Sequence, residues 1–236
     1  MKALGEAKKV YDLMIDGFDW KEAYSEFYFS TGLYNYYREY YPEANPVYKP
    51  FAIFFKSGDK VKGLEQLEYA SKYTVFSKPE AMAYLAFIYF RSENQPEKSI
   101  EYHRDLYHTF KGNHYYLKSY IEVLLLTDRF ETARKLNQLL KGSPNASYFK
   151  AAYFTFEGMM AEKEDGKWQI AANHYHRARE ILEGNEIENF AESLRTYVYA
   201  GLSKYYKSLG DEKAAAAYRV LAKKYDEYNY LKKIER

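Results

Sequence analysis

Short polar turns recur along the chain, and they limit the kinds of fold that it can form. They read SGDK, SENQPEK, KGSPNAS, KEDGK, LEGNE and SLGDEK, and each separates two stretches in which apolar residues recur every three or four positions. Gly, Asn or Pro beyond the last apolar turn is typical of a helix end, and the polar residues that follow are typical of a helix start. β-Hairpin dipeptides between alternating apolar residues are missing. The pattern predicts an all-α protein.

The helices themselves repeat. About five positions after the start of each polar turn lies a residue that is usually small. An apolar or aromatic residue follows it four positions later. When Gly63, Lys98, Ala133, Ala171 and Ala215 are taken as markers of this position in each unit, the successive spacings are 35, 35, 38 and 44 residues. Two antiparallel helices in such a unit cannot bury their own apolar face, so each pair must stack on the next. We expect a single domain over residues 1–236 with about 12 helices.

These units resemble the tetratricopeptide repeat (TPR). The segments YLAFIYFRSENQPEKSIEYHRDL and YIEVLLLTDRFETARKLNQLL carry the likeness, with a large, a small and an aromatic residue on the first helix, as in Leu85, Ala86 and Tyr89, and a small residue on the second, as in Ala133. The pattern departs from the family at Lys98, which stands where a small residue is usual. The resemblance implies a right-handed α–α superhelical solenoid of TPR-like helix pairs.

A narrower stretch is similar to the tetratricopeptide repeat protein 39 family, which includes fungal inclusion-body clearance proteins. The likeness is to that family's helix–Pro–helix–Gly-Asp–helix segment and covers residues 26–71. Its matching features are Gly32-Leu33, Pro42, Phe54-Phe55, Gly58-Asp59 and Gly63-Leu64. Members of this family are non-enzymatic adaptors, so the resemblance implies adaptor-like work and carries over no site residue.

The charge balance excludes several classes of partner. The chain has 35 Lys and Arg against 33 Asp and Glu, a formal net charge of +2. Nucleic acids and anionic membranes call for a concentrated basic face, so we expect neither as a partner. The longest apolar stretches, PFAIFF and VLLLT, are far shorter than the ~20 residues that span a bilayer. The sequence therefore predicts no membrane span, and it indicates no particular oligomeric state.

The first twenty residues bear on localisation. Charges interrupt them so often that the apolar core of a secretory signal does not fit between. We expect the chain as written in the cytoplasm; a mature periplasmic or secreted form whose signal was removed stays open as the alternative. The chain has no cysteine, which excludes disulfides and thiolate metal sites but does not fix the compartment.

Residues with catalytic or metal-binding chemistry form no recognised motif. The chain has no Gly-rich phosphate loop, nucleophile elbow or dinucleotide fingerprint. The histidines lack the one-turn spacing of a zinc site on a helix: His103, His108, His114, His174 and His176. Glu162 and Asp165, near Lys163, are interpreted as solvated loop residues. We expect no catalytic residue, no metal and no cofactor, and so no enzyme.

Tyrosine is unusually frequent, with 29 copies in the chain and five in YNYYREYY, residues 34–41. In that stretch, Tyr36 and Tyr37 share a helical face with Leu33 and Tyr40, which predicts core packing, whereas Tyr34 and Tyr41 point elsewhere. A tyrosine ring packs while its hydroxyl reaches water or a backbone carbonyl, which suits the thin core of stacked helix pairs. We expect most of the tyrosines to be structural and a minority to be available to a ligand.

In TPR-like folds the first helix of each unit lines a concave wall. Projection of these helices places ten residues on it: Tyr48, Lys49, Tyr84, Phe87, Arg91, Lys118, Glu122, Phe156, Met159 and Lys204. Aromatic residues interspersed with Lys and Arg are typical of a groove that binds protein or peptide. We expect a non-enzymatic scaffold or adaptor that binds another protein or an extended peptide. The alternative is a carbohydrate- or small-molecule-binding helical-repeat protein that uses the same rings for stacking.

The closing segment, YDEYNYLKKIER, is rich in charge. Stacked repeats need a polar outer face at each end, because the last pair has no neighbour to cover it. We therefore expect this segment to form a polar cap. Such a cap counts against open-ended stacking of one chain on another.

Overall fold

The computed structural model describes residues 2–52, 55–143, 146–164, 167–184, 191–226 and 230–234, and over these ranges it contains no β-strand. The all-α prediction is confirmed. Two residues used above, Phe54 and Asp165, lie outside the described ranges. Within those ranges eleven long α-helices follow one another: α1 (Lys2–Trp20), α2 (Phe27–Ala44), α4 (Lys60–Tyr73), α5 (Lys78–Arg91), α6 (Pro96–Thr109), α7 (His114–Leu125), α8 (Phe130–Leu140), α9 (Ala146–Glu162), α10 (Trp168–Gly184), α11 (Glu192–Ser208) and α12 (Glu212–Tyr225). Three short elements accompany them: the 3₁₀ helix η1 (Pro46–Tyr48), α3 (Lys49–Ala52) and α13 (Leu231–Ile234).

The polar turns end one helix and begin the next, as predicted. Asp59 precedes α4, and its carboxylate accepts the backbone N–H of Lys62 at 2.9 Å. Asp211 caps α12 in the same way, accepting the N–H of Ala214 at 3.0 Å. Each cap satisfies one of the backbone donors that the first turn of a helix leaves without a partner.

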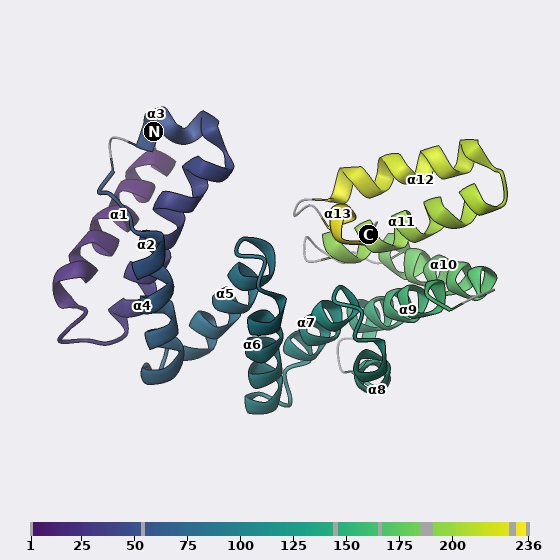
Figure 1. Ribbon diagram of the computed structural model, residues 1–236, viewed down its shortest axis with the longest axis horizontal. Helices are drawn as coiled ribbons and strands as arrows, with labels where there is room; N and C mark the ends of the chain where they lie inside the picture. The colour runs from purple at the N-terminus through teal and green to yellow at the C-terminus, as the bar shows by residue number, and fades with distance from the viewer. Residues whose placement is uncertain are drawn as a thin grey trace. The chain divides into compact units, whose positions relative to one another are not determined.

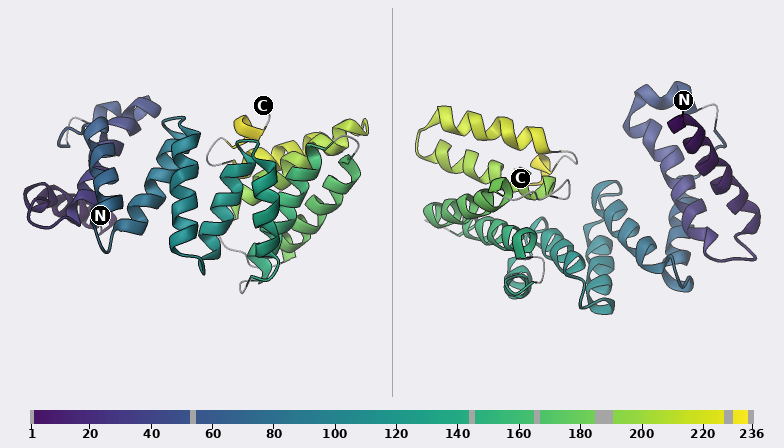
Figure 2. Two further views of the ribbon diagram at one scale, coloured as in Figure 1. Left: turned by 60° about the horizontal axis from the view of Figure 1, so that its bottom comes forward. Right: turned by 180° about the vertical axis from the view of Figure 1, so that it is seen from behind.

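The chain forms two compact units, residues 1–102 and 103–236, and the single domain over 1–236 stays a prediction. In the first unit, α1 packs on α2, α2 on α4 and α4 on α5, and α1 and α2 lie side by side in Figures 1 and 2. The centre of this unit is a cluster of fully buried side chains from three helices: Tyr36, Leu67, Leu85, Ile88 and Tyr89. The prediction that Tyr36 belongs to the core is confirmed.

Two glycines let α2 and α4 approach closely. A Cβ added at Gly63 would lie 2.5 Å from the backbone nitrogen of Tyr36 and 2.9 Å from the carbonyl oxygen of Gly32. A backbone atom cannot move aside as a side chain does, so only glycine fits at this crossing. The sequence predicts a close approach of paired helices at the small residue Gly63, and this contact confirms it.

The marker at Lys98 is displaced by one residue. Lys98 is exposed, and its Nζ lies 4.6 Å from the centre of the Tyr89 ring. The small buried residue of this pair is Ser99, whose hydroxyl donates to the carbonyl of Ala86 at 2.7 Å. The unit therefore keeps a small residue between its helices, and the Lys98 ammonium lies over an aromatic ring instead.

Tyr34 corrects one of the predictions for YNYYREYY. It does point away from the face of Tyr36, but it is buried, because α1 covers that side of α2. Its ring lies 5.6 Å from Phe18 in an edge-on contact, and its hydroxyl donates to the carbonyl of Lys56 at 2.6 Å. Tyr41 is about half exposed. The rings of Tyr34 and Tyr36 therefore pack on opposite faces of α2, whereas the ring of Tyr41 is open to solvent.

In the second unit, each helix packs on the next from α7 to α12, and α7, α9 and α11 also pack on one another in succession. The small residues predicted inside these pairs, Ala133, Ala171 and Ala215, are buried. The helices thus pack in neighbouring pairs, and the first helices of successive pairs share one side. Among the described residues, no helix is both long and apolar enough to cross a membrane.

Candidate functional site

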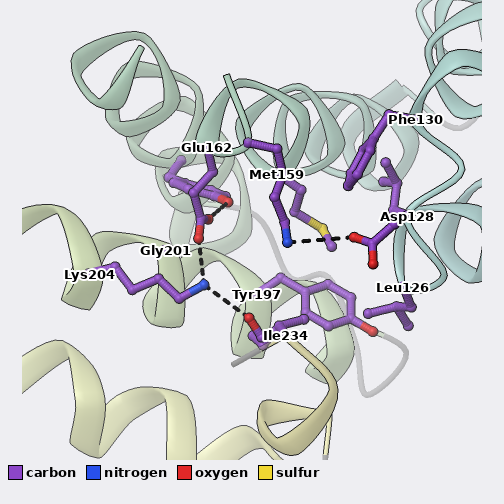
Figure 3. A pocket seen from close by; sticks show the side chains of 12 residues that line it. Leu126, Asp128, Phe130, Met159, Glu162, Tyr197, Gly201, Lys204 and Ile234 are labelled. Carbon is purple, nitrogen blue, oxygen red and sulfur yellow. Dashed lines mark hydrogen bonds and ion pairs between the residues drawn. The ribbon is translucent and has the colours of Figure 1, made fainter. Parts of the chain in front are cut away.

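A pocket lies on the side of the second unit where α7, α9 and α11 meet (Figure 3). Its cavity volume is about 60 Å³, enough for roughly four to six waters at ~10–15 Å³ each. Aliphatic and aromatic side chains supply most of the wall: Leu125, Leu126, Phe130, Met159, Tyr197 and Ile234. Two acid–lysine pairs complete it, Glu162 with Lys204 and Asp128 with Lys163. Apolar and polar side chains share the lining, so this small recess is a candidate binding site.

Glu162 is the central polar group of this pocket. Its Oε1 accepts a hydrogen bond from Nζ of Lys204 on α11 at 2.5 Å, and its Oε2 accepts the hydroxyl of Tyr175 on α10 at 2.6 Å. Burial raises the pKa of Tyr175 well above its ordinary value, and the neighbouring Glu162 carboxylate adds to the effect. Tyr175 therefore stays a neutral donor, and it fixes the carboxylate toward the pocket.

Tyr175 has its place because two glycines make room for it. A Cβ at Gly158 on α9 would lie 2.6 Å from Cε1 of the ring, and a Cβ at Gly201 on α11 would overlap the opposite edge. The ring thus fills the space between the two first helices, α9 and α11. The pocket depends on this contact, because it sets where Glu162 and Lys204 stand.

The second acid–lysine pair stands at the edge of the pocket and is exposed. Nζ of Lys163 lies 3.5 Å from Oδ1 of Asp128. Asp128 adopts a left-handed backbone conformation, φ 60°, in the turn between α7 and α8, which Asp tolerates better than most residues. An exposed pair of this kind adds little stability, so we interpret it as an adaptable polar rim.

Tyr197 is fixed from behind by a buried ion pair. Nζ of Lys118 lies 2.6 Å from Oε2 of Glu122 one turn along α7, and the Tyr197 hydroxyl donates to Oε1 of Glu122 at 2.8 Å. Both charged side chains are buried, so the pair must be satisfied internally. The contact ties α7 to α11 and holds the Tyr197 ring in the pocket wall.

The residues predicted for the concave wall of the second unit lie in three different environments. Met159 and Lys204 lie together in the pocket. Lys118 and Glu122 form the buried pair behind it, so they support the wall rather than present their charges. Phe156 is fully buried, which corrects the expectation that a ligand meets its ring. It packs in the core because α9 has neighbours on several sides, which the projection of a single helix does not include.

The predicted residues of the first unit differ in their exposure. Tyr48, Lys49 and Tyr84 are exposed. Phe87 packs on the core cluster, and the guanidinium of Arg91 lies 4.3 Å from the centre of its ring. Both side chains of this cation–π contact are partly buried.

Several pocket residues were missed by the sequence analysis. Glu162 is the last residue of α9 and its side chain is nearly buried, which corrects its interpretation as a solvated loop residue. Tyr197, Gly201 and Ile234 were not predicted either. A usable signal exists for Gly201: two glycines inside apolar helices, at 158 and 201, predict a close helix approach or a bulky neighbour.

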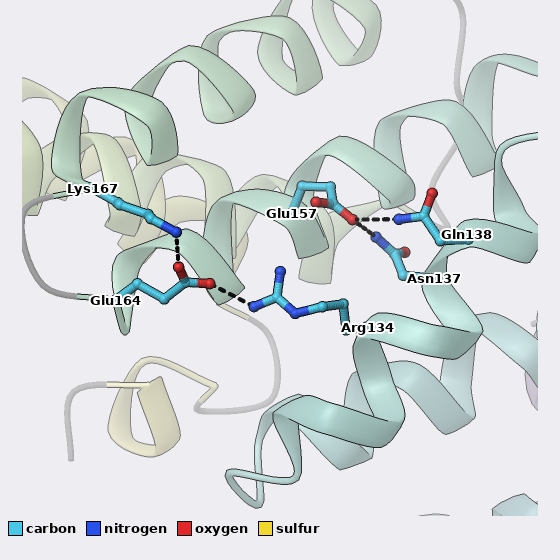
Figure 4. Close-up of polar contacts among 6 residues, drawn as sticks. All are labelled: Arg134, Asn137, Gln138, Glu157, Glu164 and Lys167. Atoms are coloured by element: carbon cyan, nitrogen blue, oxygen red, sulfur yellow. Dashed lines mark hydrogen bonds and ion pairs between the residues drawn. The ribbon is translucent and has the colours of Figure 1, made fainter.

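A second polar cluster lies where α8 meets α9 and the α9–α10 turn (Figure 4). Glu164 pairs with Arg134 at 2.6 Å and with Lys167. Glu157 accepts the side-chain amides of Asn137 and Gln138 at 2.8 and 3.3 Å. These contacts join neighbouring helices, and we interpret the cluster as a structural tie. Among the described residues, no group of three or more His, Asp or Glu is placed to hold a metal ion.

Comparison with known proteins adds no relative to this picture. No protein-family model, curated protein or solved structure matches the chain. The likeness to tetratricopeptide repeats therefore stays a prediction. What the protein does is inferred below from the pocket itself.

Proposed function

We propose that the protein is a non-enzymatic scaffold or adaptor that binds a peptide, or an extended segment of another protein, in the pocket formed by α7, α9 and α11. The observation that carries the proposal is the convergence of three successive first helices on one apolar recess with placed polar groups. The same packing supports a right-handed superhelical stack of TPR-like pairs as the wider architecture. In such a stack, the shared side of the first helices is the binding face.

The charges of the pocket favour a peptide over a strongly charged ligand. Each lysine in it has a carboxylate partner, Lys204 with Glu162 and Lys163 with Asp128. The paired charges cancel, so the pocket offers no net attraction to a phosphate or a nucleic acid. Polar groups that are held in place suit main-chain N–H and C=O groups, and the apolar wall suits side chains.

The polar contacts also favour binding over catalysis. Both oxygens of Glu162 are engaged, one by Lys204 and one by Tyr175. A general base needs a carboxylate oxygen within hydrogen-bond distance of the proton that it removes. Here both carboxylate oxygens already accept hydrogen bonds from protein groups. We therefore propose no catalytic role for Glu162.

The carbohydrate alternative has less support. Sugar stacking needs open ring faces, but tyrosines between α11 and α12 stack on one another. Tyr206 lies 5.4 Å from Tyr218 at an interplanar angle of 15°, and Tyr199 lies 6.2 Å from Tyr218 at 23°. Rings that cover one another have less face to offer a ligand.

A selection experiment tests the proposal. A phage-displayed random peptide library would be panned on the full chain and on Met159→Glu, which places a charge in the apolar wall. Val220→Glu is the matched control, because Val220 is an exposed apolar residue on α12 outside the pocket lining. We expect peptides that bind the wild type and Val220→Glu equally and bind Met159→Glu at least ~10-fold more weakly, with the three chains equally helical. Peptides that ignore Met159→Glu, or an absence of any enriched peptide, would contradict the proposal.

A further inference from the structure

We propose that the pocket face of α11 recognises one helical turn of the form Tyr-Leu-x-x-Ile, and that the chain's own segment 230–234, whose Ile234 forms part of the pocket wall, packs there as a built-in ligand. This inference rests on the proposed function and deepens it, because it names the chemistry of the peptide. Segment 230–234 consists of Tyr230 and the four residues of α13, which packs against α11. An incoming peptide of the same chemistry must displace it.

The first anchor is the aromatic residue of the segment. The ring of Tyr230 lies 5.2 Å from the ring of Tyr197 at an interplanar angle of 70°, the edge-to-face arrangement that aromatic pairs favour. Tyr230 and Leu231 are both buried, although they belong to a stretch in which charged residues abound. The polar cap expected of this segment stays a prediction: Lys232 is exposed, and residues 227–229 and 235–236 lie outside the described ranges.

The second anchor joins the segment to the polar centre of the pocket. Nζ of Lys204 donates to the backbone carbonyl of Ile234 at 3.1 Å while it pairs with Glu162 (Figure 3). The Ile234 side chain lines the pocket itself. A carbonyl at the end of a helical turn has no partner within the helix, so a fixed ammonium is a suitable donor for it. Lys204 thus binds the main chain of the segment, and the apolar wall contacts its side chains.

The turn is held in shape by one carboxylate. Oδ1 of Asp226 accepts the backbone N–H of Tyr230 at 2.6 Å and that of Leu231 at 3.4 Å. Neither contact involves the pocket wall. Asp226 is not a lining residue of the pocket, so its substitution offers a way to loosen the segment from outside the pocket wall.

Self-occupancy has a measurable consequence. When only a fraction of molecules has an empty pocket, the apparent dissociation constant for an external peptide rises by the inverse of that fraction. Releasing the segment should therefore tighten binding of a peptide that copies it. A pocket with a different specificity would not respond in this way.

The test uses a fluorescein-labelled synthetic peptide, DEYNYLKKIER, which copies residues 226–236, and fluorescence anisotropy on full-length chains. The chains are the wild type, Tyr230→Ala/Leu231→Ala and Asp226→Ala. We expect the double variant to bind the peptide at least ~10-fold more tightly than the wild type, with Asp226→Ala in between. A peptide carrying Tyr230→Ala should lose at least ~10-fold in affinity for every chain. Asp226→Ala alone decides the matter if the double variant does not fold.

Equal affinity for the wild type and the released variants, or an indifference to the Tyr230→Ala change in the peptide, would overturn the inference. The library selection separates this failure from failure of the proposed function. Peptides selected on the wild type that need Met159 but share no aromatic–aliphatic turn would leave the scaffold proposal standing and reject the built-in ligand. Selection of no peptide, together with no binding of DEYNYLKKIER to any chain, would reject both.

Discussion

The ring of Tyr175 lies directly against the backbone of Gly201. A Cβ at position 201 would overlap Cε2 of the ring and would lie 2.7 Å from Cδ2. The ring, in turn, holds Glu162 through its hydroxyl. Helix packing and pocket chemistry are therefore set by the same pair of residues.

Substitution of this glycine tests the relationship. We expect Gly201→Ala to lower the free energy of unfolding by about 2–3 kcal/mol, because the fully buried Tyr175 ring has no room to move. Gly184→Ala is the control, since a Cβ there meets nothing within 4 Å and Gly184 is the last residue of α10, where its backbone φ is one that alanine also adopts. Urea denaturation measures both. A loss below ~0.5 kcal/mol for Gly201→Ala would mean that the two helices are farther apart than described.

The buried pair behind the pocket should respond non-additively. Lys118→Met leaves the Glu122 carboxylate buried without its partner, and we expect a loss of about 3–5 kcal/mol. The double variant Lys118→Met/Glu122→Gln removes that stranded charge, so we expect it to recover at least about half of the loss. A double-mutant cycle in urea checks this. Strictly additive losses would show that the two side chains do not depend on each other.

The stability lost on replacing each tyrosine of α2 by alanine should follow how deeply its ring is buried. Tyr36→Ala removes a fully buried ring from the core of the first unit, and we expect a loss of about 3–5 kcal/mol. Tyr34→Ala should cost about 2–4 kcal/mol, because α1 covers that ring. Tyr41→Ala, at a half-exposed position, should stay below ~1 kcal/mol. If Tyr34 behaved like Tyr41, α1 would not pack on α2 as described.

The turn before α5 should make the first unit sensitive to acid. Burial opposes ionisation of Glu26, but the hydroxyl of Ser77 and the backbone N–H groups of Val75, Phe76 and Ser77 donate to its carboxylate and lower its pKa from 4.5 to about 2. Because the folded pKa lies below the unfolded one, its stabilising effect is full above pH 4.5 and is lost as the pH falls towards 2.

We therefore expect Glu26→Gln to cost about 1–2 kcal/mol at pH 7, a figure reduced for partial exposure of the site. The difference from the wild type should shrink below pH 4.5 and nearly vanish at pH 2. Glu65→Gln, an exposed change on α4, is the control and should leave the pH profile unaltered. Thermal unfolding across pH 2–7 gives the answer. A constant difference over this range would show that the bonds to Glu26 do not depend on its charge.

The helical pairing was predictable because its causes are local. Polar turns and caps such as Asp59 act within a few positions of the helix that they begin, and small residues such as Gly63 and Ala171 follow these turns at a nearly constant distance in the sequence. The one-residue displacement from Lys98 to Ser99 was not predictable in this way. It depends on whether the Lys98 ammonium can lie over the Tyr89 ring, which is a contact between two helices.

The pocket was predicted only in part, for a related reason. Met159 and Lys204 could be projected onto the shared side of the first helices, whereas Phe156, on the same helix as Met159, is buried by neighbours that no single-helix projection includes. Ile234 reaches the pocket through a turn far from α9 in the sequence. Contacts between distant segments of this kind decide which residues of a helix a ligand can meet.

The most direct test of the binding site is to map where a bound peptide lies. A peptide selected on the wild type would carry benzoylphenylalanine in place of its aromatic anchor, and mass spectrometry would locate the photo-crosslink on the full chain. The account predicts crosslinks to the pocket wall at Leu126, Met159 or Tyr197, competed by unlabelled peptide. Crosslinks confined to the first unit, or to the exposed side of α12 around Val220, would contradict it.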